Sequence, residues 1–217
     1  MAKKRVAVLI SGRGSNMAAL VEAARAPDYP AEIALVVSNR PEAAGVAFAA
    51  RERVPTAVVD HRPYGQDRAA FEQALQATLD RHRIELICLG GFMRLFTDAF
   101  VLRWQGRMLN IHPSLLPAFK GLDPHGQAVA AGVKISGATV HFVTPEMDSG
   151  PIVAQAAVPV HDDDTAATLA ARVLAVEHRI YPLALRLVAE GRVRIADGRC
   201  RIDGARPAET ALIVPEP

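Results

Sequence analysis

Short, continuous apolar runs alternate with longer helical patterns through the first half of the chain, and this alternation limits the fold more than any other feature. Strands that are apolar on both faces and are joined by helices are typical of a parallel sheet covered on both sides. With right-handed crossovers, the pattern predicts an α/β, Rossmann-like, doubly wound, mostly parallel sheet with helices on both faces. The expected strands are Val6–Ile10, Ile33–Ser38, Ala57–Val59 and Leu86–Leu89, and the expected helices are 17–24, 43–53 and 67–83.

The second half predicts a different mixture of elements. Pro and Gly residues between 113 and 126 indicate a long loop, of the kind that carries function. Strands are expected at Met108–His112, Val133–Val143 and Ile152–Val160, and a small hairpin at Val193–Ile195 and Arg199–Ile202. A long helix is expected to start near 162–165, to kink at Pro182 and to end at Glu190-Gly191. Its apolar stripe comprises Leu169, Val173, Val176, Ile180, Leu183 and Leu187.

Composition excludes several classes of protein. The chain has 217 residues, of which 50% are hydrophobic and 22% charged, so it can bury a core without a disulfide or a metal. Lys and Arg number 25 against 23 Asp and Glu, a balance that argues against a protein built on nucleic-acid contacts. Cys88 and Cys200 show no metal or redox spacing. No apolar run suits a signal peptide or a membrane span, so we expect a soluble, cytoplasmic protein. No HExxH or similar spacing exists, so we expect no metal.

A Gly-rich loop, Gly12-Arg13-Gly14-Ser15-Asn16, joins the first expected strand to the first expected helix. Backbone N–H groups and the positive end of a helix dipole meet there, which favours a phosphate. The alternative is a tight turn in which Ser15 is the N-cap and no ligand is needed. Met17 replaces the third glycine of a dinucleotide fingerprint, and 38–40 lack the acid that would bind a ribose. The loop therefore favours a phosphate without a dinucleotide.

Polar residues gather where the strand at 108–112 runs into the Pro-rich loop. Asn110 and His112 are two residues apart and share a face of that strand. An amide and an imidazolium side by side would stabilise an oxyanion, and Asp148, from a second loop, would orient the imidazole. A structural histidine and a turn-forming aspartate explain the same residues, and spacing does not choose between the two interpretations. His125 and His141 are further candidates for this crevice, and Arg94 is either a surface charge or an anion contact.

Several motifs together resemble the folate-dependent formyltransferases, and among these the glycinamide ribonucleotide formyltransferases. The resemblance covers about residues 5–195. The strand and loop at 110–117 look like the element shared across the larger family, whereas the Gly-rich loop and the helix at 177–182 point to the narrower branch. The matching segments are VLISGRGSN (8–16), LGGFMR (89–94), NIHPSLLP (110–117), VHFVT (140–144), DSGPI (148–152) and EHRIYP (177–182).

The resemblance implies an activity and a set of site residues. The activity is transfer of the formyl group of 10-formyltetrahydrofolate, a co-substrate, to the amine of glycinamide ribonucleotide in purine biosynthesis. Asn110, His112 and Asp148 would be catalytic; Gly14, Ser15 and Asn16 would bind the phosphate, and Glu177 the ribose hydroxyls. Without the resemblance, Glu177 is interpreted as a solvated helix charge. The folate would contact Arg68, Met93, Arg94, Leu95, Phe96, Asn110, Thr144, Pro145, Glu146, Met147 and Asp148.

The resemblance also implies how the chain is organised. We expect one formyltransferase domain at 1–205, with a phosphate-binding half at about 1–105 and a catalytic and folate-binding half at about 106–205. Residues 206–217 are expected to form a flexible tail. The protein would act as a monomer or homodimer, without a nucleic-acid or membrane partner.

Four rival functions fit parts of the same sequence. Methionyl-tRNA formyltransferases need an additional RNA-binding domain, for which the sequence after about 205 leaves no room. Formyltetrahydrofolate deformylases carry an N-terminal regulatory domain, whereas the first strand is expected to begin near Arg5. A nicotinamide-dependent oxidoreductase is disfavoured by Met17 and by the missing acid after the second strand. A non-catalytic sugar-phosphate-binding protein would keep the Gly-rich loop but has no need of Asn110, His112 and Asp148 together.

Overall fold

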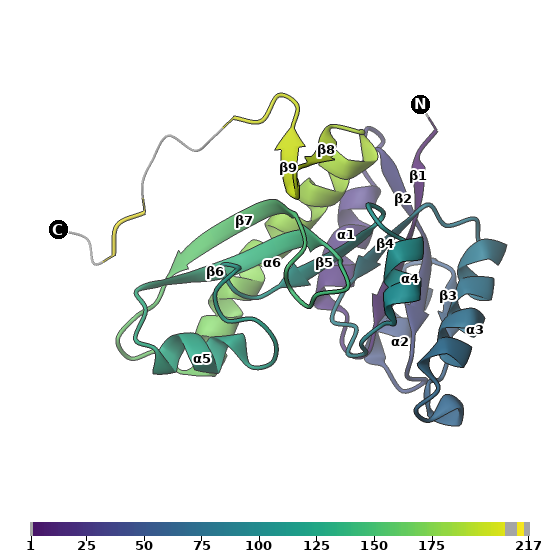
Figure 1. The fold of residues 1–217 in the computed structure, drawn as a ribbon, viewed down its shortest axis with the longest axis horizontal. Coiled ribbons are helices and arrows are strands. Elements are labelled where there is room, and N and C mark those ends of the chain that lie inside the picture. The colour runs from purple at the N-terminus through teal and green to yellow at the C-terminus, as the bar shows by residue number, and fades with distance from the viewer. Residues whose placement is uncertain (1, 207–211, 215–217) are drawn as a thin grey trace. The chain divides into compact units, whose positions relative to one another are not determined.

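The computed structural model describes residues 2–206 and 212–214, and it confirms the predicted fold class. Seven strands form one mostly parallel sheet in the order β3-β2-β1-β4-β5-β6-β7, and β8 and β9 form a separate hairpin (Figure 1). The strands are β1 (Lys4–Ile10), β2 (Ala31–Ser38), β3 (Thr56–Val58), β4 (Leu86–Leu89), β5 (Met108–His112), β6 (Ile135–Phe142), β7 (Ile152–Pro159), β8 (Val193–Ala196) and β9 (Arg199–Ile202). The helices are α1 (Ser15–Ala24), α2 (Ala44–Arg51), α3 (Arg68–Arg81), α4 (Asp98–Arg103), α5 (Pro124–Ala130) and α6 (Ala166–Ala189), with a short 3₁₀ turn at Arg62–Tyr64.

Residues 1–110 and 142–145 form one compact unit. Its strands pair in parallel, β1 with both β2 and β4, β2 with β3, and β4 with β5. One face of these strands packs against α3 and α4, where Phe71, Leu75 and Trp104 join Leu9 and Ile87 in a buried cluster. Each of these five side chains is at most 2% exposed, so this face forms a continuous apolar core.

The opposite face of the same unit is covered by α1 and α2. Ile10 lies so close to Gly45 of α2 that a Cβ on Gly45 would stand 2.5 Å from the Ile10 side chain. Leu20 and Met17 of α1 are fully buried. The runs that are apolar on both faces are therefore explained by helices on both sides of the sheet, as predicted.

Residues 111–141 and the described residues after 145 form the second compact unit. β6 and β7 pair antiparallel, and α6 packs along β7 and against α5 (Figure 1). Thr165 caps α6, since its side chain accepts a hydrogen bond from the Thr168 backbone N–H while Thr168 bonds back to the Thr165 backbone. The helix continues through Pro182 to Ala189, and the β8–β9 hairpin follows it.

The structure corrects four expectations. α4 and α5 were not predicted, and α5 begins inside the stretch expected to be a loop. Gly14, not Ser15, is the N-cap of α1. Leu183 is 49% exposed although the predicted stripe placed it inside, while Ala184 is fully buried. The predicted period is that of an α-helix, but the buried face of α6 is rotated toward Glu177, Tyr181 and Ala184, which leaves Leu183 at its exposed edge.

The remaining expectations concern the cysteines, the tail and membrane crossing. Cys88 is buried, Cys200 is half-buried, and both are free thiols. Of the expected tail, 207–211 and 215–217 lie outside the described residues. Among the residues that the structure describes, no helix combines the length and the apolar character that a membrane crossing requires.

Candidate active site

The Gly-rich loop places the N-terminus of α1 at the carboxyl end of β1. Gly14 adopts a left-handed backbone, φ 71° and ψ 36°, and no side chain caps the helix. A Cβ on Gly14 would stand 2.9 Å from the terminal methyl of Met17, which a flexible side chain can move, so the left-handed backbone is what requires glycine here. The Gly45 backbone N–H donates to the Gly12 carbonyl at 3.0 Å and fixes the far side of the loop. The helix N-terminus is left without a side-chain cap, which suits an anion.

The other residues of the loop differ in exposure. Ser15 is half-buried, Asn16 is buried and Arg13 is exposed. Gly45 was not singled out from the sequence, because a glycine at the start of a helix gives no signal for a contact with a loop some 30 residues earlier.

The segment Met93–Phe96 follows β4 and presents apolar side chains to solvent. Met93 and Leu95, two residues apart, are each 64% exposed. Phe96 is partly buried between Phe92 and Phe100, with ring centroids 5.3 and 4.7 Å away. The exposed thioether and alkyl groups suit the face of a flat ring system, whereas Phe96 supports the segment from beneath.

Helix α3 lies against this segment. The Arg94 guanidinium stands 5.3 Å from the centre of the Phe71 ring, and its Nε is buried without a hydrogen-bond partner among the described residues. Arg68 is exposed and begins α3, three residues before Phe71 and hence on the same side of the helix. Of the two cations expected from the sequence, Arg94 therefore contacts α3 through Phe71, and Arg68 lies at the start of that helix; both belong to the first unit.

A buried carboxylate lies between two histidines in the second unit. Asp148 Oδ2 is 3.5 Å from His112 Nδ1, and Asp148 Oδ1 is 3.8 Å from His141 Nε2. The side chains of all three are at most 10% exposed. The Gly121 backbone N–H donates to Asp148 Oδ2 at 2.9 Å and holds the carboxylate in place. The sequence analysis predicts that Asp148 orients His112 and gives His141 as a further candidate for the same crevice. In the structure the three side chains lie together.

The partners of His112 determine which of its nitrogens carry protons. His112 Nε2 is 2.9 Å from the Phe119 carbonyl oxygen, and because a carbonyl oxygen only accepts, Nε2 carries a proton. Nδ1 faces the carboxylate, so a second proton there gives an imidazolium paired with Asp148. The arrangement can hold a cationic donor and, through the carboxylate, accept a proton. The contact with Phe119 was not predicted, because every residue has a backbone carbonyl and the residue type does not indicate which one accepts a hydrogen bond.

His125 lies near this cluster on α5. Burial lowers the pKa of His125 below its ordinary value of 6.5, and the neighbouring His112 lowers it further, while Asp123 acts in the opposite direction. Its Nδ1 is buried and has no hydrogen-bond partner among the described residues. His125 is therefore a neutral neighbour of the Asp–His pair at neutral pH.

The other expected residues are placed as follows. Glu177 is 6% exposed on α6, so the interpretation as a solvated helix charge is wrong. Asn110 is half-buried on β5. Asp148 itself has a positive φ of 50°, uncommon for a residue with a side chain. Between β6 and Asp148, Thr144 is half-buried, and the exposed residues are Pro145, Glu146 and Met147.

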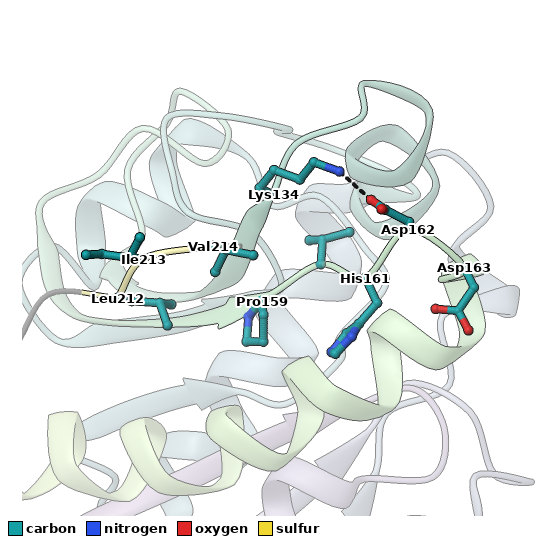
Figure 2. A pocket seen from close by; sticks show the side chains of 9 residues that line it. Lys134, Pro159, His161, Asp162, Asp163, Leu212, Ile213 and Val214 are labelled. Atoms are coloured by element: carbon teal, nitrogen blue, oxygen red, sulfur yellow. Dashed lines mark hydrogen bonds and ion pairs between the residues drawn. The ribbon is translucent and has the colours of Figure 1, made fainter. Parts of the chain in front are cut away.

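A metal site and a further surface hollow are the two other features that bear on function. Across residues 2–206 and 212–214, no group of three or more His, Cys, Asp or Glu side chains is arranged to hold a metal ion. A surface hollow of about 460 Å³ opens between the end of β7 and residues 212–214 (Figure 2). Lys134 and Asp162 form an ion pair at its edge, and none of the predicted site residues lines it.

Fold and site together define a class: an open α/β protein with an anion-binding loop at its first helix and a buried aspartate–histidine pair. The chain belongs to the formyl transferase family, whose profile matches residues 4–185. It is 39% identical over 201 residues to the phosphoribosylglycinamide formyltransferase of Haemophilus influenzae, a match that covers 93% of this chain and 94% of that one.

Two further similarities agree with this assignment. The chain is 49% identical over 195 residues to the human trifunctional purine biosynthetic protein adenosine-3, covering 90% of this chain but 19% of that protein's length. The solved structure of glycinamide ribonucleotide transformylase 1 from Symbiobacterium toebii superposes with a TM-score of 0.89 at 47% identity, over 92% of this chain and 94% of that one.

Proposed function

We propose that this protein transfers the formyl group of 10-formyltetrahydrofolate to the amine of glycinamide ribonucleotide, a step of purine biosynthesis. The observation that carries the proposal is the near full-length match to the Haemophilus influenzae phosphoribosylglycinamide formyltransferase. The buried Asp148–His112 pair supports it, because formyl transfer needs a donor for an oxyanion and an acceptor for a proton.

The ribonucleotide is recognised by its phosphate and its sugar. Gly14, Ser15 and Asn16 bind the phosphate at the N-terminus of α1, where backbone N–H groups and the helix dipole favour an anion. Glu177 accepts hydrogen bonds from the ribose hydroxyls. The burial of Glu177 supports this role, because a carboxylate shielded from water is a stronger hydrogen-bond acceptor than a solvated one.

The folate lies against the exposed apolar segment. Met93 and Leu95 contact its ring system, Arg94 lines the same pocket with Phe96, and Arg68 pairs with the glutamate carboxylates. The cations suit the negative tail, and the exposed thioether suits a flat ring. Thr144, Pro145, Glu146 and Met147 form the loop over the pterin, together with Asn110 and Asp148.

The reaction proceeds without a covalent enzyme intermediate. The substrate amine attacks the formyl carbon, and the carbonyl oxygen becomes an oxyanion. Protonated His112 and the Asn110 amide stabilise that oxyanion, each by roughly 2–4 kcal/mol by analogy with oxyanion holes. Asp148 stabilises the imidazolium and takes the amine proton toward N10 as the bond between the formyl carbon and N10 breaks. The Phe119 carbonyl now accepts from His112 Nε2, so a substrate oxygen that uses this donor must replace it.

We propose, further, that residues 1–205 act as one formyltransferase domain whose phosphate-binding half is about 1–105 and whose catalytic half is about 106–205. The protein acts in the cytoplasm, as a monomer or a homodimer, and needs no metal, membrane or nucleic acid for the reaction.

The test is an assay of purified protein with both substrates, in which the deformylated folate is followed by absorbance and the formylated product by mass. Product that requires both substrates supports the proposal. Folate deformylation in the absence of the amine would instead indicate a hydrolase. Ribonucleotide binding without turnover would indicate a binding protein or another amine acceptor.

A further inference from the structure

We infer that Ser11 is a positioning residue that couples the phosphate loop to the folate-binding segment, so that each substrate strengthens the binding of the other. The inference rests on the proposed function, because it concerns the two ligands of that reaction. Every residue that carries it belongs to the first unit of the chain.

Ser11 makes hydrogen bonds to two different segments. It is 7% exposed and directly follows β1, and its backbone N–H donates to the Gly91 carbonyl at 3.2 Å. Its hydroxyl donates to Asn39 Oδ1 at 2.6 Å and accepts from the Met93 backbone N–H at 2.8 Å. A serine hydroxyl has one proton to give, so this geometry uses it fully and leaves a lone pair for Met93.

Asn39 fixes the direction of that hydroxyl. Asn39 is 1% exposed, and its backbone N–H donates to the Ile10 carbonyl. His61 Nδ1 lies 2.8 Å from the Asn39 carbonyl oxygen, to which it donates. Because Asn39 is held from both sides, its Oδ1 orients the Ser11 O–H and thereby the acceptor that Met93 uses.

Ser11 is continuous with the phosphate loop. Gly12 follows Ser11 directly, and the Gly12 carbonyl accepts a hydrogen bond from the Gly45 N–H. The loop is therefore connected to Ser11 by the chain and to α2 by this hydrogen bond. An anion that orders this loop also orders Ser11. The Met93 backbone, which bonds to the Ser11 hydroxyl, is thereby ordered as well.

Glu72 holds the other end of the folate segment, but it is not adjacent in sequence to the phosphate loop. Glu72 of α3 is 6% exposed and accepts from the Thr97 backbone N–H at 2.6 Å and from the Thr97 hydroxyl at 2.5 Å. Met93 and Thr97 are thus both tied down, with the exposed Leu95 between them. Glu72 shapes the segment from α3, whereas Ser11 joins it to the phosphate loop.

These contacts give a physical route for cooperativity. A ligand that orders the phosphate loop lowers the ordering cost of the folate segment for the second ligand. Linkage requires the same factor in both directions, which provides an internal check on the measurement.

The test measures dissociation constants by calorimetry for glycinamide ribonucleotide and for tetrahydrofolate, each alone and with the other at saturation, without oxygen. In the wild type we expect each ligand to tighten the other at least about fivefold, within the usual range of coupling factors. Ser11→Ala should reduce the factor to less than about twofold while the affinity for the ribonucleotide alone changes by less than about threefold. Ser11→Thr, which keeps the hydroxyl, should retain the coupling, and Ser11→Cys, a weaker donor, should lose most of it.

Two matched variants separate coupling from general damage. Ser38→Ala removes another buried serine at a strand end, whose hydroxyl serves only the Arg40 backbone among the described residues, and should leave the factor unchanged. Glu72→Gln should weaken tetrahydrofolate binding and leave the factor unchanged. Full coupling in Ser11→Ala, equal loss in Ser38→Ala, or wild-type binding of both ligands without coupling would each overturn the inference. Failure of the wild type to bind either ligand would overturn the proposed function itself.

Discussion

Asp148→Asn tests the centre of the proposed mechanism with a minimal change of shape. The amide still offers an oxygen to the Gly121 N–H, which now lies 2.9 Å from Oδ2, so the loop can keep its position. The negative charge opposite His112 Nδ1, at 3.5 Å, is lost. The variant therefore removes the partner of the imidazolium and the acceptor of the amine proton while it preserves packing.

The structure sets the size of the expected effect. At an effective dielectric constant of about 20, opposite unit charges 4 Å apart attract by about 4 kcal/mol. Screening by solvent is modest here, because the Asp148 side chain is 10% exposed. A loss of about 4 kcal/mol of transition-state stabilisation corresponds to roughly a 10³-fold decrease in rate.

The assay is steady-state formyl transfer, with kcat and the two KM values determined separately. We expect kcat to fall by about 10³-fold while the KM for the ribonucleotide changes by less than about threefold, because the phosphate loop is untouched. Asp162→Asn is the control, since Asp162 is exposed and pairs with Lys134 at the surface. A kcat for Asp148→Asn within about threefold of the wild type would remove the carboxylate from the mechanism.

Three further predictions concern stability and reactivity. Gly14→Ala should lower the free energy of unfolding by about 1–2 kcal/mol in urea, because its φ is +71°, whereas Gly12→Ala should have little effect, since a Cβ there meets nothing within 4 Å. Equal losses in the two would contradict the backbone argument. Leu187→Ala should lower the free energy of unfolding by about 2–5 kcal/mol and Leu183→Ala by less than about 1 kcal/mol, because the Leu187 side chain is 8% exposed and that of Leu183 is 49% exposed. Comparable losses in the two variants would restore the stripe predicted from the sequence. Burial raises the pKa of the Cys200 thiol to about 11, so its alkylation by iodoacetamide should be slow at pH 8 and accelerate as pH rises toward 11; rapid reaction at pH 8 would refute this.

The strands were predictable because their signal is local. A run such as Val6–Ile10 is apolar at every position, and that pattern suits a strand covered on both faces. The long helices were predictable because several turns repeat the same apolar spacing, as in α3 with Phe71, Leu75 and Leu79.

The two missed helices show where that signal fails. α4 has six residues and α5 seven, so neither completes enough turns to display a period. Both begin at a capping side chain, Thr97 and Asp123, whose oxygen accepts a backbone N–H three residues on. Short helices of this kind are held by their caps and by the surrounding structure, and the caps alone resemble ordinary turns.

The candidate site shows the same difference between local sequence signals and contacts made by the folded chain. The sequence by itself determined the Gly-rich loop, the pairing of Asn110 with His112 on one strand, and the motifs of the family, because each lies within a few consecutive residues. Tertiary structure decided the rest: that Asp148 stands between His112 and His141, that Glu177 is buried, and that the Ser11 hydroxyl reaches Met93. These contacts join residues separated by up to 82 positions, and burial and hydrogen bonding between distant segments depend on how the whole chain packs, which no local pattern encodes.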